Sequence, residues 1–351
     1  MGTKKYRLTE NHINIGNRIL YQIEALKDFG NVKSGDLGGY IESEENLSQY
    51  DNAWVYGNAQ VHGNAQVRGN AQVFGNAQVF GNAWVCDNAK VCGNAQVHGN
   101  AQVHGNAKVY GDAQVHGNAK VYGDAQVRDN AQVRGNAQVF GNAQVCGNAQ
   151  VHGNAQVHGN AKVYGDAQVY GNAQVYGNAQ VFGNAWVFGN AWVCDNAKVC
   201  GNAQVCDNAK VRGDAQVCDN AEVCDNAKVC DNAEVHGNAK VCDNAKVYGD
   251  AKVCDNADVF GNAQVYGDAE IKSKEDYIVF KNWWSSGRYF TWTRSNNMWK
   301  VGCFYGTGEE LIKKAYNDSK ESCREYERIV RYVESILADE KRKENEPIGI
   351  K

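Results

Sequence analysis

Proline is almost absent from this sequence, since Pro347 is the single proline among 351 residues. This scarcity excludes a proline-rich disordered chain. The sequence also lacks any run of 18 apolar residues, so it predicts no membrane-spanning helix. Its first ten residues, MGTKKYRLTE, lack the apolar core of a signal peptide. The net charge of −4 and the pI near 6.1 give no overall attraction to nucleic acid or to an anionic membrane.

Cysteine, in contrast, is plentiful, with 13 residues. In a short secreted protein this number would indicate a framework of disulfide bonds. In a long chain without a recognisable signal peptide, we expect reduced thiols and a cytoplasmic location instead.

A six-residue repeat occupies most of the chain. An aliphatic residue recurs at every sixth position from Val55 to Ile271 without insertion or deletion, which makes 37 units. Within each unit, Val is followed by a variable residue, then Gly or Asp, then Asn or Asp, then Ala and a polar residue. The regularity predicts a repeat architecture rather than several ordinary domains.

The order of residues within a unit predicts a short strand and a corner. Ala59-Gln60-Val61 alternates small apolar, polar and aliphatic residues, which is the period of a strand with Ala and Val on one side. Gly57-Asn58 predicts a corner, because Gly and Asn tolerate positive φ. Strands and corners in constant phase predict a coil that stacks on itself, so that backbone amides pair between coils and Val and Ala fill the interior.

This pattern resembles the hexapeptide-repeat, left-handed parallel β-helix family, in which three six-residue faces form one triangular coil. The resemblance covers residues 39–272. It implies an all-β solenoid, a left-handed triangular parallel β-helix of about twelve coils and roughly 55–60 Å in length. The left hand is implied by the resemblance alone, because connections between parallel strands are usually right-handed.

The variable position suggests two roles for the outer surface. It is Tyr, Phe, His, Cys or Arg in the first 36 units, and residues eighteen apart are expected to stack on one face. Such ladders of aromatic and Gln side chains stabilise a solenoid. The alternative is a binding face, because exposed large aromatic side chains indicate a partner. We expect Trp54, Trp84, Trp186 and Trp192 to be exposed, and Trp186, Phe188 and Trp192 are candidate binding residues.

Cysteines at the same spacing are candidate metal ligands. Thiolate and imidazole groups suit zinc or copper. A linear ladder makes a poor tetrahedron, however, and the sequence has no CxxC motif; the same spacing also permits disulfide bonds between coils. We expect no cofactor, and the candidate metal ligands are Cys206, Cys224 and Cys242 on one face and Cys218, His236 and Cys254 on another.

Both ends of the chain depart from the repeat. Open solenoid ends expose unpaired strand edges, so residues 1–38 are expected to form an N-terminal β cap with strands at 6–8 and 19–23. Coiling is expected to start at Ile41 and Leu47, before the regular repeat. The segment IEALKDFGNVKSGDLGGYIESEENLS is similar to the N-terminal cap of bacterial and prophage hexapeptide-repeat proteins of unassigned role.

After the repeat, residues 273–338 predict a small C-terminal α+β domain, and residues 339–351 predict a charged tail. The runs YIVF, RYFTWT and WKVGCF predict three strands. Thr307 and Glu310 form a capping box that opens a helix over 309–316, and a second helix is predicted over 318–337. The segment VGCFYGTGEELIKKA is similar to a small C-terminal module of prophage-encoded proteins.

The C-terminal domain contains a second candidate binding surface. A basic aromatic patch would suit nucleic acid or an acidic partner, whereas the simpler interpretation is a Trp core with solvated charges, so nucleic acid is not the expected partner. Cys303 is expected to be a buried thiol, because no His lies in this domain to activate it. The residues of the candidate patch are Trp283, Trp284, Arg288, Trp292 and Arg294.

The expected function is that of a non-catalytic scaffold. The hexapeptide-repeat family includes many acyltransferases, for which the resemblance implies a catalytic His near an extruded loop, with acyl-CoA or acyl-carrier protein bound between subunits. No loop interrupts the 37 units, and His98 and His104 alternate with Tyr and Cys on neighbouring coils. We therefore expect a scaffold or spacer, associated with a prophage, that forms a homo-oligomer or binds a protein or host factor through its C-terminal domain or an outer face. The alternative is a protein of phage–host conflict that binds a ligand or macromolecule with its aromatic, His and Cys face.

Overall fold

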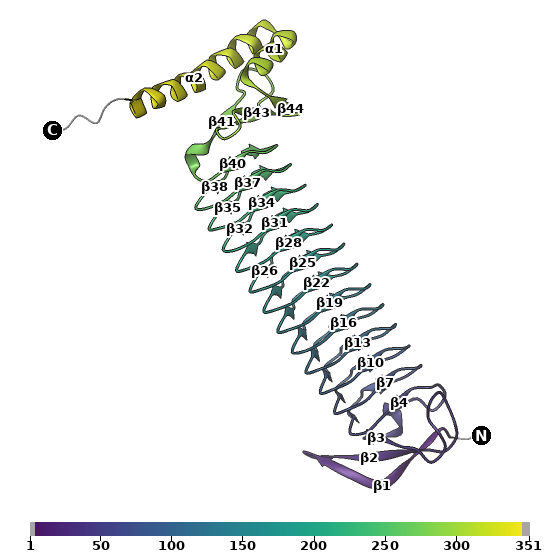
Figure 1. Ribbon diagram of the computed structural model, residues 1–351. Helices are drawn as coiled ribbons and strands as arrows, with labels where there is room; N and C mark the ends of the chain where they lie inside the picture. The colour runs from purple at the N-terminus through teal and green to yellow at the C-terminus, as the bar shows by residue number, and fades with distance from the viewer. Residues whose placement is uncertain (1–3, 346–351) are drawn as a thin grey trace, which may run out of the picture.

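The computed structural model describes residues 4–345, which form a rod with a hairpin at one end and a small domain at the other (Figure 1). Strands β1 (Tyr6–Ile15) and β2 (Arg18–Ala25) make the hairpin. Strand β3 (Leu37–Ile41) pairs antiparallel with β2 and parallel with β5 (Gln60–Val61), and so joins the hairpin to the first coil.

The rod itself is a parallel β-solenoid. Its 37 strands, from β4 (Trp54–Val55) to β40 (Glu270–Ile271), are two residues long and start every six residues. Every third strand pairs, with residues eighteen apart in register, as in Val61 with Val79. Three faces result. Face 1 runs from β3 to β38 (Asp258–Val259), face 2 from β6 (Gln66–Val67) to β39 (Gln264–Val265), and face 3 from β4 to β40.

The solenoid has about 13 turns, because face 3 contains 13 strands. The expected number was about twelve. The 37 regular strands make just over twelve turns, and at the N-terminal end β3, which pairs with the repeat, and Leu47, which bridges to Val67, complete the thirteenth. The left hand of the coil stays a prediction from the resemblance.

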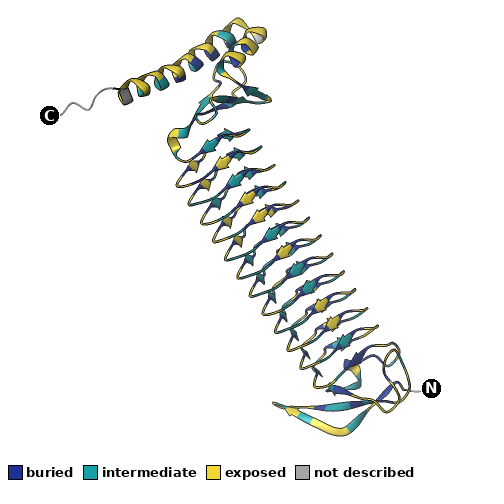
Figure 2. Cartoon of the chain, in the orientation of Figure 1, coloured by how far each residue is buried: buried dark blue, intermediate teal, exposed yellow. Residues whose placement is uncertain are grey.

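Valine and alanine fill the interior as the repeat predicts. Every repeat Val and Ala from Ala53 to Val265 has 0% exposed surface. The residue between them points outward, and the alternation recurs along the whole rod (Figure 2). Fully burying one Val side chain stabilises a fold by about 1.5 kcal/mol or more, so the repeated burial provides most of the stability of the stack.

The corners use their two residues differently. The first corner residue has positive φ, as in Gly57 (58°) and Asp87 (59°). Asn at the second position does not have positive φ. The prediction that Asn occurs there because it tolerates positive φ was therefore wrong. Its side chain instead links coils, since Nδ2 of Asn142 donates to Oδ1 of Asn160 at 3.0 Å and the same bond recurs along the corners. Asn ladders, rather than the expected Gln ladders, therefore predominate.

Polar side chains satisfy the backbone at both ends of the solenoid. At the N-terminal end, Asn46 of the short helix η1 (Glu44–Asn46) donates to the carbonyl of Ala65 at 2.9 Å. At the other end, the hydroxyl of Thr291 accepts the N–H of Gln264 at 2.8 Å. These bonds satisfy backbone groups at the open strand edges, which otherwise are templates for end-to-end pairing.

Lys5 is an unusual part of the N-terminal end because its side chain is only 1% exposed. Its ammonium group donates to the carbonyls of Asp51 and Ala53 at 3.0 and 2.8 Å. Burial lowers the pKa of Lys5 from 10.5 to about 8, although the nearby Asp51 carboxylate opposes that change. The buried charge therefore weakens the fold at neutral pH.

The C-terminal domain is an antiparallel sheet covered by two helices. Helix η2 (Lys274–Asp276) leads into the sheet, and its strands and helices are β41 (Tyr277–Lys281), β42 (Tyr289–Thr293), β43 (Met298–Val301), β44 (Phe304–Gly306), α1 (Gly308–Asp318) and α2 (Lys320–Asn345). A turn at Gly302 (φ 56°) divides the predicted third strand into two. The predicted capping box of Thr307 and Glu310 is confirmed.

Helix α2 continues further than predicted. It ends at Asn345 rather than near Leu337, so residues 339–345 of the predicted charged tail are helical. One contact that holds this last part is the ion pair between Arg294 and Glu340 at 2.6 Å. Residues 346–351, including Pro347, lie outside the described residues. Within residues 4–345, no helix combines the length and the apolar character needed to cross a membrane.

Candidate functional site

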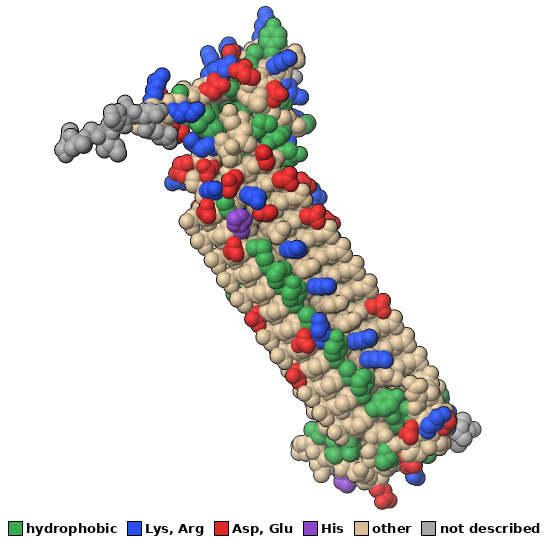
Figure 3. Space-filling model, in the orientation of Figure 1, with side chains coloured by type: hydrophobic (Ala, Val, Ile, Leu, Met, Phe, Trp, Pro, Cys, Tyr) green, Lys and Arg blue, Asp and Glu red, His purple; other side chains and the backbone are tan. Residues whose placement is uncertain are grey.

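The variable residues form three outer rows, one at the edge of each face. Most of them are half-buried, and where aromatic rings follow one another along a row, each ring lies against the ring of the next coil. On face 1, the ring centroids of His62 and Phe80, Phe80 and His98, and His98 and His116 are 5.1, 4.6 and 4.9 Å apart, and the rings are nearly parallel. The predicted stacking is confirmed. Figure 3 shows such a line of hydrophobic side chains along the rod.

The stacked histidines are poor candidates for catalysis. Burial lowers the pKa values of His98, His116, His152 and His158, so their imidazoles are neutral at pH 7. Each lies in a regular row, whereas a general base needs an oriented environment of its own. The strands from β4 to β40 keep their six-residue spacing, so no inserted loop approaches these side chains.

Three of the four repeat tryptophans are exposed as predicted. Trp84, Trp186 and Trp192 are 49%, 40% and 37% exposed. The prediction for Trp54 was wrong, since it is 1% exposed. Its ring packs edge-on against Phe29 at 5.2 Å, because the N-terminal hairpin and loop cover the first coil.

The candidate binding residues of the repeat do not share one face. Trp186 belongs to β26 (Trp186–Val187) on face 1, and Phe188 follows it and stacks on Tyr170 at 5.0 Å. Trp192 belongs to β27 (Trp192–Val193) on face 2, where the Lys210 ammonium lies 4.1 Å from its ring. Consecutive units lie on different faces of the coil, so the predicted surface is two separate surfaces.

The first set of candidate metal ligands does come together, with two additional carboxylates. The donor atoms of Cys206, Glu222 and Cys224 lie within 4.8 Å of one another, as do those of Cys224, Asp225 and Cys242. Glu222 and Asp225 place oxygen donors beside the line of sulfur atoms, which the sequence interpretation missed. Burial and neighbouring acids raise the pKa of Cys206 to about 12 and raise that of Cys224 as well, so the thiols are protonated at neutral pH.

The second set of candidate ligands does not come together. Cys218 forms a disulfide with Cys200 of the preceding coil, with their Cα atoms 4.6 Å apart. This bond differs from the expectation of reduced thiols and removes Cys218 as a metal ligand. Within the described residues, His236 and Cys254 join no group of three donor atoms at metal-binding distance.

The predicted basic aromatic patch is divided between the core and the surface. Trp292 is 1% exposed and belongs to the core of the C-terminal domain, whereas Trp283 is 74% exposed. Trp284 packs partly against that core, at 5.2 Å from the ring of Tyr326. Arg294 pairs with Glu340, so its charge is compensated. Arg288 does not join the tryptophans and lines a cavity instead.

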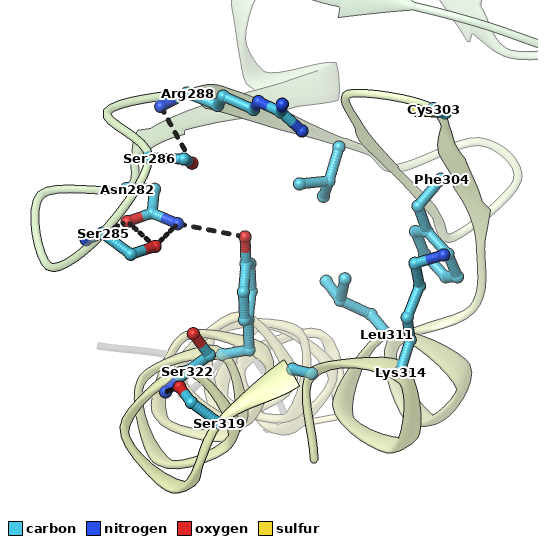
Figure 4. Close-up of a pocket in the computed structure, with 13 residues that line it drawn as sticks. Asn282, Ser285, Ser286, Arg288, Cys303, Phe304, Leu311, Lys314, Ser319 and Ser322 are labelled. Carbon is cyan, nitrogen blue, oxygen red and sulfur yellow. Dashed lines mark hydrogen bonds between the residues drawn. The ribbon is translucent and has the colours of Figure 1, made fainter. Parts of the chain in front are cut away.

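This cavity lies between the C-terminal sheet and the two helices and has a volume of about 430 Å³ (Figure 4). Arg288, Ser285 and Ser286 come from the loop between β41 and β42, and Lys314 comes from α1. Cys303, expected to be buried, is exposed at its edge. Because the cavity forms from segments without a repeat, no spacing in the sequence indicated it.

Comparison with known proteins agrees with the architecture. Four stretches of the chain match the family model described as "YdcK Beta solenoid repeat", at residues 71–87, 143–159, 173–187 and 179–195. The chain is a β-solenoid repeat protein. The matched stretches all lie within the solenoid, and neither the N-terminal hairpin nor the C-terminal domain contributes to them. No curated protein matches the sequence.

Proposed function

We propose that this β-solenoid is a non-catalytic scaffold or spacer, which holds a variable outer surface and separates its two ends by about 60 Å. The observation that supports this function is the unbroken register of β4 to β40 around a fully buried core. Such a stack has no inserted loop to build a catalytic site, and its paired strands resist bending. Rigidity and constant width are the properties that a spacer needs.

The C-terminal domain is the proposed point of attachment to a protein partner or to a second copy of the chain. It carries the exposed Trp283, and it lies at the end of the rod opposite the hairpin (Figure 1). Association with a prophage belongs to the same proposal and rests on the resemblance of the two terminal segments.

The experiment compares the partners of three chains that are cross-linked in the native host and analysed by mass spectrometry. The first chain is the natural one. In the second, the variable residues between Val97 and Val193 are permuted among Tyr, Phe, His and Arg. The third lacks residues 139–156, one complete coil, and is expected to be shorter by about 4.8 Å in small-angle X-ray scattering.

If the protein is a scaffold, all three chains should cross-link to the same partner through the C-terminal domain. Circular dichroism must first show that the permuted and shortened chains fold. If the permuted chain folds but loses the partner, the outer rows are a binding surface and the scaffold proposal is wrong. Native mass spectrometry of the same samples gives the oligomeric state and the mass of any bound ligand.

A second candidate function is binding of a soft metal ion on face 1. The observation that favours it is the convergence of Cys206, Glu222 and Cys224, and of Cys224, Asp225 and Cys242. Thiolate sulfur with carboxylate oxygen suits zinc, and Cys224 belongs to both groups. Because the thiols must lose protons, binding should strengthen as the pH rises.

Titration with cadmium tests this function through the ultraviolet absorbance of thiolate–cadmium bonds. Cys224→Ser should abolish the absorbance, whereas the matched control Cys92→Ser, which removes a half-buried thiol on another face, should leave it unchanged. Equal absorbance in both variants would show that cadmium binds thiols indiscriminately and would reject the site.

A further inference from the structure

The cavity of the C-terminal domain has an unusual charge. Among the described residues that line it, the charged side chains are Arg288 and Lys314, and both are cationic. Among the side chains that the structure describes, neither forms an ion pair with a carboxylate, whereas Arg294 and Arg331 in the same domain do. Two cations at one cavity without an acidic partner leave a positive potential that an anion would neutralise.

Hydroxyl groups line the cavity beside Arg288 and at the start of helix α2. Ser285 and Ser286 lie beside Arg288 in the loop, and Ser286 Oγ accepts the Arg288 backbone N–H at 3.4 Å (Figure 4). Helix α2 begins at the cavity, where Ser319 Oγ accepts the backbone N–H of Ser322 at 3.0 Å. The positive end of the helix dipole therefore adds to the potential of the two cations.

The loop that carries Arg288 is held in place by buried polar contacts. Asn282 is 2% exposed and donates to Ser285 Oγ at 2.9 Å and to the hydroxyl of Tyr326 at 3.3 Å. The backbone N–H of Asn282 also donates to the carbonyl of Arg288 at 2.7 Å. These bonds link both ends of the loop to helix α2, so the loop is organised before any ligand binds.

The remaining wall is apolar. Val301, Phe304 and Leu311 line the cavity, and the Lys314 ammonium lies 5.9 Å from the centre of the Phe304 ring. The volume of about 430 Å³ is within the range of small-molecule sites. Arg288 and the loop serines thus form one wall of the cavity, and Phe304, Leu311 and Lys314 form the wall opposite (Figure 4).

We propose that this cavity binds a small molecule that carries a carboxylate or phosphate group and an apolar portion. The anionic group lies against Arg288 and the neighbouring serine hydroxyls, where the planar guanidinium donates two parallel hydrogen bonds to it, and Lys314 on the opposite wall adds its positive potential. The apolar portion contacts Phe304 and Leu311. This site is separate from the scaffold role of the solenoid and does not depend on it.

Isothermal titration calorimetry of the full chain tests the site with four probes: phenyl phosphate, benzoate, inorganic phosphate and neutral benzamide. Phenyl phosphate or benzoate should bind, and the stronger of the two identifies the anionic group. Inorganic phosphate should bind more weakly because it lacks the apolar portion, and benzamide should not bind. Loss of the charged hydrogen-bond donor should weaken binding about tenfold to hundredfold in Arg288→Gln. Loss of the positive potential of Lys314 should weaken it about threefold to tenfold in Lys314→Gln.

Two control variants make the outcome decisive. Lys313→Gln removes the same charge from the adjacent position of α1, outside the cavity, and should leave the affinity unchanged. Arg288→Lys keeps the charge without the planar donor pair and should give an intermediate affinity. Circular dichroism checks that each variant folds. The proposal is wrong if neither phenyl phosphate nor benzoate binds, if benzamide binds as well as they do, or if Lys313→Gln weakens binding as much as Lys314→Gln.

Discussion

The corner glycines allow a sharp test of how the coils stack. Gly141 has φ +68°, and a Cβ atom placed on it would lie 3.1 Å from both the N and the O of Gly159 in the next coil. Gly261 has the same φ of +68° in the last coil, where a Cβ atom would meet nothing within 4 Å. The two sites therefore share the cost of positive φ and differ in the contact with a following coil.

Substituting Ala at Gly141 should lower the free energy of unfolding by about 1–2 kcal/mol for the left-handed backbone, plus a further amount for the close contact. Asp should be tolerated better. In the natural chain Asp129 occupies the same first corner position of its six-residue unit, and its Oδ2 accepts the N–H of Gly147 at 3.1 Å. An Asp at 141 gains the equivalent bond to the N–H of Gly159, which should recover about 1 kcal/mol relative to Ala.

Urea unfolding of four variants, followed by circular dichroism, measures these differences. The variants are Gly141→Ala, Gly141→Asp, Gly261→Ala and Gly261→Asp. At position 141, we expect the Asp variant to have a higher free energy of unfolding than the Ala variant. This difference should exceed the one at position 261 by about 1 kcal/mol, because no following coil supplies an N–H there. An equal difference at both positions would refute the reasoning, because it would mean that Asp is tolerated only for its intrinsic backbone preference.

Three further predictions concern the ends of the rod. Between pH 8 and 10.5 the unfolded state holds the Lys5 proton that the folded state has lost, so the free energy of unfolding should rise by up to about 1.4 kcal/mol per pH unit. The melting temperature of the natural chain should therefore rise with pH relative to that of Lys5→Met. Parallel melting-temperature curves for the two chains would contradict this. Trp54→Ala should lower the free energy of unfolding by about 3–5 kcal/mol and speed hydrogen exchange in the N-terminal hairpin. Trp84→Ala, which removes an exposed ring, should lower it by under about 0.5 kcal/mol. Similar losses in the two variants would show that burial of the ring does not matter here. Thr307→Ala should cost about 1 kcal/mol by removing the cap of α1, measured as earlier melting of the helical signal, and an unchanged melting curve would show that the cap is dispensable.

The repeat made much of the fold predictable. Because Val and Ala recur with a period of two within a unit and six between units, the sequence alone predicts which side chains face inward, and their complete burial confirms it. The stacking of His62, Phe80 and His98 also followed from counting eighteen residues. Local periodicity was sufficient here because each coil contacts only its neighbours.

The candidate sites were less predictable, since they depend on side chains that the period does not align. Glu222 and Asp225 lie two residues before and one residue after Cys224, so their closeness to it was visible in the sequence, but the prediction considered only residues at the variable position of each unit. Trp186 and Trp192 are adjacent in the repeat but lie on different faces. Trp54 was predicted from its position in the repeat, although the non-repetitive hairpin buries it.

The sequence by itself determined the parallel solenoid, its start before the first regular unit and its inward-facing residues, because identical short units must repeat one local geometry. Only the tertiary structure decided how the ends are closed and that Arg288 and Lys314 line one cavity. These features join segments with no common period, such as the β41–β42 loop and helix α1. Their proximity follows from how the whole C-terminal domain packs, and no local pattern encodes it.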